Sequence, residues 1–227
     1  MNNIFSFTVS VLVMLAMTVE TAQSQTTVPE DSVRAPLWQG VTVEIDMAPV
    51  VTNLFNDRSS FRYEAAARIN LLNKYFPVIE AGYESRHQQL NSGIDFLGTG
   101  MFYKAGVDLS IIKSELKHSI NNKFLLGARI GMSHFEYDVT NIPVRNAING
   151  SAASVDWTGQ RQTAYWMEIV AGIRIEVVKR VIMGWSVRTK NPFGEAEAGS
   201  VGPWYIPGFG RAGDSVWAFN YTIGYQF

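Results

Sequence analysis

The last eleven residues of the chain alternate strictly between large apolar side chains and small or polar ones. The small or polar positions are Ala218, Asn220, Thr222, Gly224 and Gln226, and the apolar positions are Trp217, Phe219, Tyr221, Ile223, Tyr225 and Phe227. Successive side chains of a β-strand point to opposite faces, so this pattern predicts a strand with one apolar face and one face that can meet water. A soluble protein rarely exposes such an edge, because it templates aggregation. A closed membrane barrel has no free edge, and lipid solvates its apolar face.

The composition favours a membrane barrel over a helical membrane protein. The 227 residues are 17% charged, below the roughly 25% of soluble domains, and 12% aromatic. Mean hydropathy is close to zero at +0.01, because each strand averages an apolar and a polar face. The formal charge of −1 gives no electrostatic reason to expect a nucleic-acid partner. The chain has no Cys, which excludes disulfides and thiolate sites, and no motif in it calls for a cofactor.

The N-terminus predicts an export signal. The chain is uncharged through Val19, is apolar from Val9 to Val19, and has a small-residue site at Ala22-Gln23-Ser24. We therefore expect residues 1–24 to be a cleaved signal peptide, although Met1-Asn2-Asn3 lacks the usual Lys or Arg. The alternative is a retained anchor helix, but the apolar run is shorter than the roughly 20 residues that a spanning helix needs. The polar, proline-containing stretch 25–37 predicts a periplasmic tail.

Eight segments of the remaining chain alternate in the same way, which predicts an all-β fold over 38–227. They are 38–50, 60–72, 76–86, 100–112, 123–138, 163–177, 181–189 and the terminal segment. Transmembrane strands need about 9–11 residues, so these segments predict an eight-stranded antiparallel transmembrane β-barrel.

The connections between these segments alternate in length. The three at 73–75, 113–122 and 178–180 are short or modest, and the four at 51–59, 87–99, 139–162 and 190–213 are longer. Bacterial outer-membrane barrels have short periplasmic turns and long extracellular loops, so the asymmetry supports that class. A soluble lipocalin-like barrel also has eight strands, with its apolar face inward, and alternation alone does not distinguish the two.

Charged residues of both signs occupy the face predicted to be inward. They are Glu44, Asp46, Glu64, Glu80, Glu84, Asp108, Glu168 and Glu176 against Arg62, Arg68, Arg86, Lys104, Arg129, Arg174 and Arg188. Eight strands enclose just enough room for side chains, and buried charges must be paired. We therefore expect an ion-pair network that fills the barrel. A narrow polar pore, or a carboxylate pair such as Glu80 with Glu84, is the alternative.

No residue set predicts catalysis or metal binding. The histidines His87, His118 and His134 lack metal-ligand spacing. The pair Ser133 and His134 could suggest a lipid-acting outer-membrane hydrolase. Adjacent residues of a strand point to opposite faces, however, so these two side chains are kept apart. We expect His134 to lie at the membrane interface and the protein not to be an enzyme.

The stretch Pro203-Trp204-Tyr205-Ile206-Pro207-Gly208-Phe209-Gly210 is the most distinctive loop. Its prolines and glycines restrict the backbone. Trp204, Tyr205 and Phe209 are candidate partner-contact residues, because large aromatics dominate binding hot spots. An equal alternative is a cap over the barrel mouth.

Two resemblances add to this reading. The apolar positions Phe219, Tyr221, Ile223, Tyr225 and Phe227 resemble the C-terminal signal of bacterial outer-membrane proteins, which implies that the terminal strand addresses the chain to the barrel-assembly machinery. The stretches 36–41, 184–188 and 203–210, together with the terminal strand, resemble a family of small outer-membrane barrels of the Bacteroidota, a domain of unknown function. That resemblance implies an eight-stranded barrel without known catalytic residues, and a place beside BamA in an expanded barrel-assembly complex.

Three functions remain as hypotheses. The first is a non-enzymatic structural or accessory subunit of an outer-membrane complex, such as the assembly machinery, with outer-membrane lipid and other outer-membrane proteins as partners. The second is a stand-alone barrel that binds a ligand or passes a small hydrophobic solute. The third is a lipid-modifying enzyme.

Overall fold

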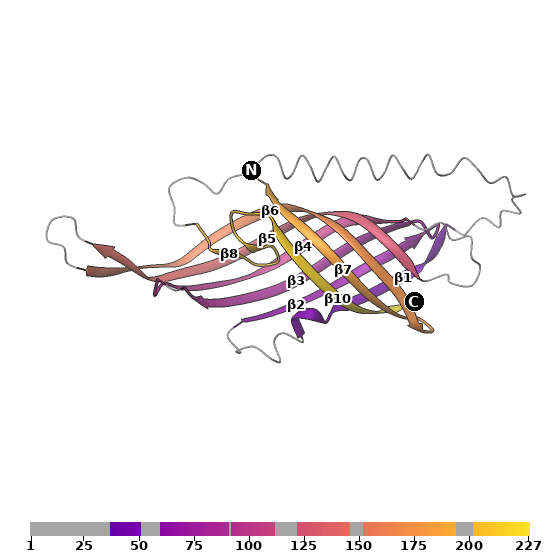
Figure 1. Ribbon diagram of the computed structural model, residues 1–227, viewed down its shortest axis with the longest axis horizontal. Coiled ribbons are helices and arrows are strands. Elements are labelled where there is room, and N and C mark those ends of the chain that lie inside the picture. Colours follow the sequence, from indigo (N-terminus) through magenta and orange to yellow (C-terminus); the bar gives the residue numbers. More distant parts are fainter. Residues whose placement is uncertain (1–36, 51–59, 91, 112–121, 146–151, 194–201) are drawn as a thin grey trace, which may run out of the picture. The chain divides into compact units, whose positions relative to one another are not determined.

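The computed structural model describes residues 37–50, 60–90, 92–111, 122–145, 152–193 and 202–227 (Figure 1). The expected signal peptide 1–24 and all but the last residue of the expected tail lie outside the described residues. The described residues include no helix long and apolar enough to cross a membrane.

Eight antiparallel strands close into a barrel, as the alternation predicts. In ring order the barrel runs β1-β10-β7-β6-β5-β4-β3-β2, so every pair of neighbours except the closing pair is consecutive among the barrel strands (Figure 1). The strands are β1 (Trp38–Asp46), β2 (Ser60–Leu71), β3 (Tyr75–Gln89), β4 (Asp95–Ser110), β5 (Lys123–Arg145), β6 (Ala152–Val178), β7 (Val181–Phe193) and β10 (Val216–Gln226). The short strands β8 (Tyr205–Ile206) and β9 (Gly210–Arg211) form a separate two-stranded hairpin.

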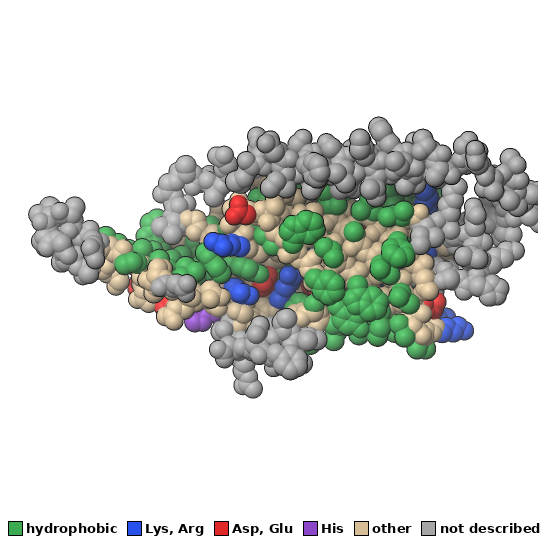
Figure 2. All heavy atoms as spheres, in the orientation of Figure 1, with side chains coloured by type: hydrophobic (Ala, Val, Ile, Leu, Met, Phe, Trp, Pro, Cys, Tyr) green, Lys and Arg blue, Asp and Glu red, His purple; other side chains and the backbone are tan. Residues whose placement is uncertain are grey.

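The barrel is apolar outside and largely charged inside. On β4, Met101 and Tyr103 are 50% and 45% exposed, whereas Phe102 and Lys104 between and after them are buried. The same alternation continues around the wall, where Ile79 and Ile130 are also exposed. Figure 2 shows hydrophobic side chains gathered over the strands on the face that it displays. This arrangement is the reverse of a lipocalin-like barrel, in which the apolar face would point inward.

The closing seam joins β1 to β10. Val43 lies opposite Tyr225 and Ile45 lies opposite Ile223, and the Phe227 N–H donates to the Val41 carbonyl at 2.9 Å. Gly40 has a φ of 110°, and a Cβ there would lie 2.5 Å from the Phe227 carbonyl oxygen, so the seam requires glycine. Closure pairs the backbone groups that an open edge would leave exposed.

The tight turns lie at one end of the barrel, as the connection lengths predict. Leu72 and Asn73 both have positive φ, and the Lys74 N–H donates to the Leu71 carbonyl at 3.1 Å. This is the type I′ geometry that matches the twist of a β-hairpin. Residues 179–180 make a second tight turn, between β6 and β7.

Two connections predicted to be long loops are short, and this part of the prediction is wrong. The loop predicted at 87–99 shrinks to 90–94 because β3 and β4 pair as far as Gln89 and Asp95. The loop predicted at 139–162 is mostly a ribbon formed by β5 and β6, which pair as far as Arg145 and Ala152 (Figure 1). Register shifts at Val139 and positive φ at Asn141 and Gly159 break the strict alternation there. For β1 the predicted strand, 38–50, is too long. The strand ends at Asp46, whose carboxylate accepts the Ala48 N–H at 3.1 Å.

The closing seam makes a direct prediction. Opposed Cα atoms in an antiparallel pair lie about 4.5–5.5 Å apart, within reach of a disulfide. Because the chain has no Cys, Ile45→Cys with Ile223→Cys should crosslink on mild oxidation. We expect the boiled, unreduced protein to carry the crosslink by mass spectrometry of linked peptides.

The matched control is Ile45→Cys with Phe219→Cys, in which the second residue is displaced by four positions, or about 13 Å, along β10. Equal crosslinking of the two variants would contradict the register, and failure of both would contradict the closed ring.

Candidate functional site: a charged interior closed by an aromatic loop

The centre of the interior is a carboxylate held by three cations. Glu80 on β3 lies 3.0 Å from Lys104 Nζ, 3.2 Å from Arg129 Nε and 2.6 Å from Arg188 Nη1. These cations come from β4, β5 and β7, so one side chain connects four strands across the barrel. All four side chains are buried. Buried charge is tolerated only when it is paired and hydrogen-bonded, and this arrangement meets that requirement.

Further carboxylates extend the pairing in both directions from Glu80. Lys104 also contacts Glu64 at 2.6 Å, and Arg188 contacts Glu168 at 3.2 Å. Towards the end with the tight turns the pairs are Arg129–Asp108, Arg68–Asp108, Arg68–Glu44 and Arg174–Glu44. The expected ion-pair network is therefore confirmed for these side chains, whereas Asp46 accepts from the Asn220 amide and Glu176 accepts the Arg180 N–H at 2.7 Å. Two cavities that remain beside it have volumes of about 20 and 30 Å³, which is room for a water or two.

The segment 202–213 folds over the other end of the interior. The Phe209 N–H donates to the Ile206 carbonyl at 3.1 Å and closes a turn between β8 and β9. Gly208, inside that turn, has a φ of 78°, and a Cβ there would lie 2.4 Å from Phe102 Cγ. Only glycine lets the backbone approach this close to the ring.

Polar contacts hold this loop to the barrel interior. Glu84 on β3 accepts the Tyr205 hydroxyl at 2.6 Å and the Gly208 N–H at 2.8 Å. Lys190 on β7 donates to the Gly208 carbonyl at 2.6 Å. Burial, together with the Glu84 carboxylate, raises the pKa of the Tyr205 phenol, so this hydroxyl remains a donor across the physiological range. The alternative that paired Glu80 with Glu84 gains no support, because Glu80 binds cations and Glu84 binds the loop.

Aromatic packing adds to these contacts. The Phe209 ring lies 5.8 Å from that of Trp166 and is 1% exposed. The Trp204 ring lies 6.0 Å from that of Phe96, which belongs to a second buried cluster with Phe135. Phe209 thus offers no surface in this structure, which favours the cap alternative for that residue. Partner contact by Trp204, Tyr205 and Phe209 stays a prediction.

The remaining sequence-derived residues lie as follows. Ser133 is buried and donates to the Met101 carbonyl at 3.3 Å, whereas His134 is exposed on the outer face beside Thr163. The structure does not bring them together. Phe219, Tyr225 and Phe227 are exposed on the outer face of β10 and at its end, with Tyr221 and Ile223 half-buried. Their role as an assembly signal stays a prediction.

Several residues of the site were not singled out from the sequence. Phe102 and Trp166 occupy inward positions between outward residues, so alternation alone could have found them. Lys190 could not be found because β7 was predicted to end at 189, one residue too early.

The buried network predicts an asymmetric cost of charge removal. Arg129→Ala leaves Glu80 and Asp108 with a missing partner inside the barrel and should destabilise it by about 3–5 kcal/mol. Arg161→Ala breaks the exposed pair with Glu136 and should cost at most about 1 kcal/mol. Urea unfolding of both variants in the same detergent measures the difference, and equal midpoints would contradict the network.

The loop anchors predict protease resistance. Glu84→Ala removes the acceptor of two hydrogen bonds, each worth about 1.5–3 kcal/mol for a charged group, so the loop should detach more often. Trypsin cleavage after the exposed Arg211 should then speed up by at least about tenfold in a protein that still migrates as a folded barrel. Tyr205→Phe should give a smaller effect and Glu136→Ala none. Unchanged cleavage in Glu84→Ala would show that Glu84 does not hold the loop.

Comparison with known proteins identifies the family. Two solved barrels resemble the chain in strand arrangement at low identity. The N-terminal β-barrel domain of Pseudomonas aeruginosa OprF is 13% identical, with a TM-score of 0.38 over 84% of this chain and 99% of that one. Ail, the attachment invasion locus protein of Yersinia pestis, solved with the heparin analogue sucrose octasulfate, is 10% identical, with a TM-score of 0.39 over 83% of this chain and 97% of that one.

No curated protein matches the chain. A family model does match, over residues 4–227, and its description is a domain of unknown function, DUF6048. Since the match covers almost the whole sequence, the chain belongs to the DUF6048 family.

Proposed function

We propose that this protein is a non-enzymatic outer-membrane β-barrel that acts as a structural or accessory subunit of an outer-membrane complex. The observation that carries the proposal is a closed barrel with an apolar outer wall and an interior filled by paired charges and capped by the 202–213 loop. A wall of exposed Ile, Val, Met and aromatic side chains is stable against lipid and a liability in water.

The filled interior favours a scaffold over a transport function. A stand-alone barrel that passes a solute needs a continuous path, whereas Glu80, Arg129 and Arg188 meet across the barrel centre. A lipid-modifying enzyme needs a nucleophile and base in contact, and Ser133 and His134 lie on opposite faces of β5. What remains available to other molecules is the outer surface.

The β5–β6 ribbon is the element that supports a partner contact best. It continues the barrel wall to Arg145 and Ala152 as a two-stranded projection (Figure 1). Val144 and Val155 on it are 43% and 41% exposed. Exposed apolar side chains on a two-stranded ribbon suit protein binding. Among complexes of the outer membrane, the assembly machinery that contains BamA is the partner implied by the resemblance noted in the sequence.

The test is co-purification from detergent-solubilised outer membranes with a tagged copy. Replacing residues 142–155 with Asn-Gly should remove the partner, since the strands that form the barrel remain paired below Asn141. The double variant Trp204→Ala with Phe209→Ala tests the loop in the same way. Both variants should still migrate differently before and after boiling, which is the mark of a folded barrel.

Partners that are retained by both variants at wild-type levels would contradict a contact through the ribbon or the loop. Recovery of the protein in the soluble periplasm would contradict the membrane location itself. Steady single-channel currents in planar bilayers would favour the solute-passing alternative, and altered lipid A by mass spectrometry would favour the enzyme.

A further inference from the structure

The outer wall contains a hollow whose floor is made of alanines. Ala65, Ala67, Ala81 and Ala105, on the adjacent strands β2, β3 and β4, face outward between much larger side chains. The hollow has a volume of about 680 Å³ and includes Tyr103 and Tyr165 in its rim. We call it the alanine hollow. Its size lies within the roughly 300–1,000 Å³ of small-molecule sites.

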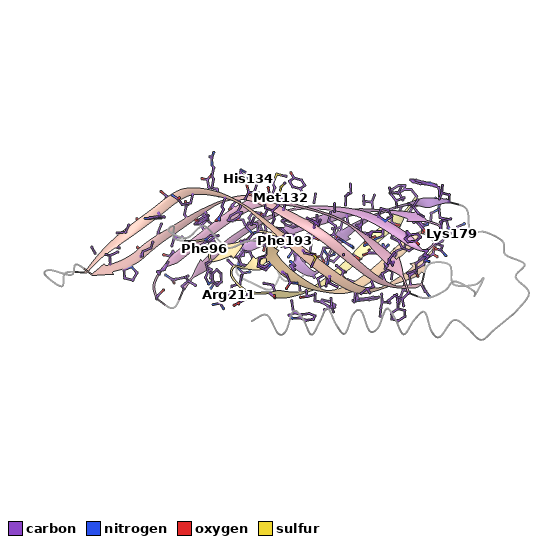
Figure 3. All side chains as sticks on the ribbon, turned by 90° about the horizontal axis from the view of Figure 1, so that it is seen from above. Phe96, Met132, His134, Lys179, Phe193 and Arg211 are labelled. Atoms are coloured by element: carbon purple, nitrogen blue, oxygen red, sulfur yellow. The ribbon has the colours of Figure 1, made fainter. Side chains whose placement is uncertain are left out.

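A second pocket, whose walls combine apolar and charged side chains, continues the alanine hollow along the same strands. This rim pocket has a volume of about 500 Å³, and its lining includes Met101, His134, Glu136, Asp138 and Arg161. Met101 lies opposite His134 in the register, and the next outward pair is Tyr103 opposite Met132, which belongs to the alanine hollow. Figure 3 shows Met132 and His134 beside one another on the barrel wall. The two pockets therefore lie end to end, one almost entirely apolar and one that also offers charged side chains.

The rim pocket offers groups of both charges. Arg161 Nε lies 3.0 Å from Glu136 Oε2, and both side chains are well exposed, at 74% and 50%. Asp138 accepts the Gly159 N–H at 2.6 Å. An exposed pair of this kind is worth at most about 1 kcal/mol. Exchanging it for ligand groups of matching charge therefore costs little.

We propose that the alanine hollow and the rim pocket together bind one zwitterionic glycerophospholipid with a primary ammonium headgroup. An acyl chain packs against the alanines, the ammonium donates to Glu136 and Asp138, and the phosphate accepts from Arg161. The inference rests on the proposed membrane location.

The charged side chains of the rim pocket favour a zwitterionic headgroup over other occupants. A purely anionic headgroup would meet two carboxylates and one guanidinium. A second protein segment could pack on the small residues of the alanine hollow. Such packing would not involve the charged side chains of the adjoining rim pocket. A lipid uses both pockets at once.

The test is native mass spectrometry of the full-length mature protein from mixed micelles with equal phosphatidylethanolamine and phosphatidylglycerol. Wild type should retain phosphatidylethanolamine over phosphatidylglycerol by about fivefold, which corresponds to about 1 kcal/mol. Ala105→Leu fills the floor of the hollow and should lower retention of both lipids. Its control is Ala171→Leu, an exposed outward alanine of β6 outside the hollow, which should bind as wild type does.

The headgroup is tested by Glu136→Gln with Asp138→Asn. This variant should lose the preference for phosphatidylethanolamine and keep the total amount of lipid, while the exposed Asp214→Asn should change neither. The proposal would be overturned if wild type retained the two lipids equally, or if Ala105→Leu retained as much lipid as wild type. A protein partner that competes with lipid for the hollow would also overturn it.

Each variant is first checked for outer-membrane fractionation and heat modification. A wild type missing from the membrane fraction refutes the proposed function, whereas a membrane-located barrel without lipid preference refutes only this inference.

Discussion

The Glu80 carboxylate is the group on which the rest of the interior depends. Three cations from β4, β5 and β7 converge on it, and each of them also contacts another carboxylate of the network. A membrane-facing wall obliges an eight-stranded barrel to turn its polar side chains inward, into a space with room for little else. Pairing then stabilises what burial would otherwise make costly. The network thus fills the barrel interior.

Most of the fold could be predicted because it obeys one period. Outward side chains such as Met101, Tyr103 and Ile130 alternate with inward ones such as Lys104 and Arg129. The alternation runs over enough residues to define the strands, the face that each side chain occupies and the number of strands. The prediction failed where that period breaks. Register shifts near Val139 and the positive φ of Asn141 change which face a side chain occupies, so the ribbon formed by β5 and β6 was predicted as a loop. Pairing between the two strands, a long-range property, overrides the local irregularity.

The site was predictable in kind and not in detail. Balanced inward charge predicts a paired interior, but which carboxylate meets which cation depends on the stagger of strands far apart in sequence, as in the contact of Arg188 with Glu80. The aromatic loop was recognised from Trp204, Tyr205 and Phe209. The inward folding of this loop was not predicted. It depends on the packing of Phe209 against Trp166 of β6 and on the hydrogen bond from the Gly208 N–H to Glu84 of β3.

Solvent access along the paired strands β4 and β5 tests the central claim most directly. With no native Cys, single Cys variants at the outward Ala105 and Val107, and at the exposed Glu136 beyond the apolar wall, report on one surface. In outer-membrane fragments open to reagent on both sides, a charged, water-soluble maleimide should label Glu136→Cys and leave Ala105→Cys and Val107→Cys unmodified until detergent and heat unfold the barrel. Labelling of all three in the intact membrane would contradict a lipid-embedded outer wall.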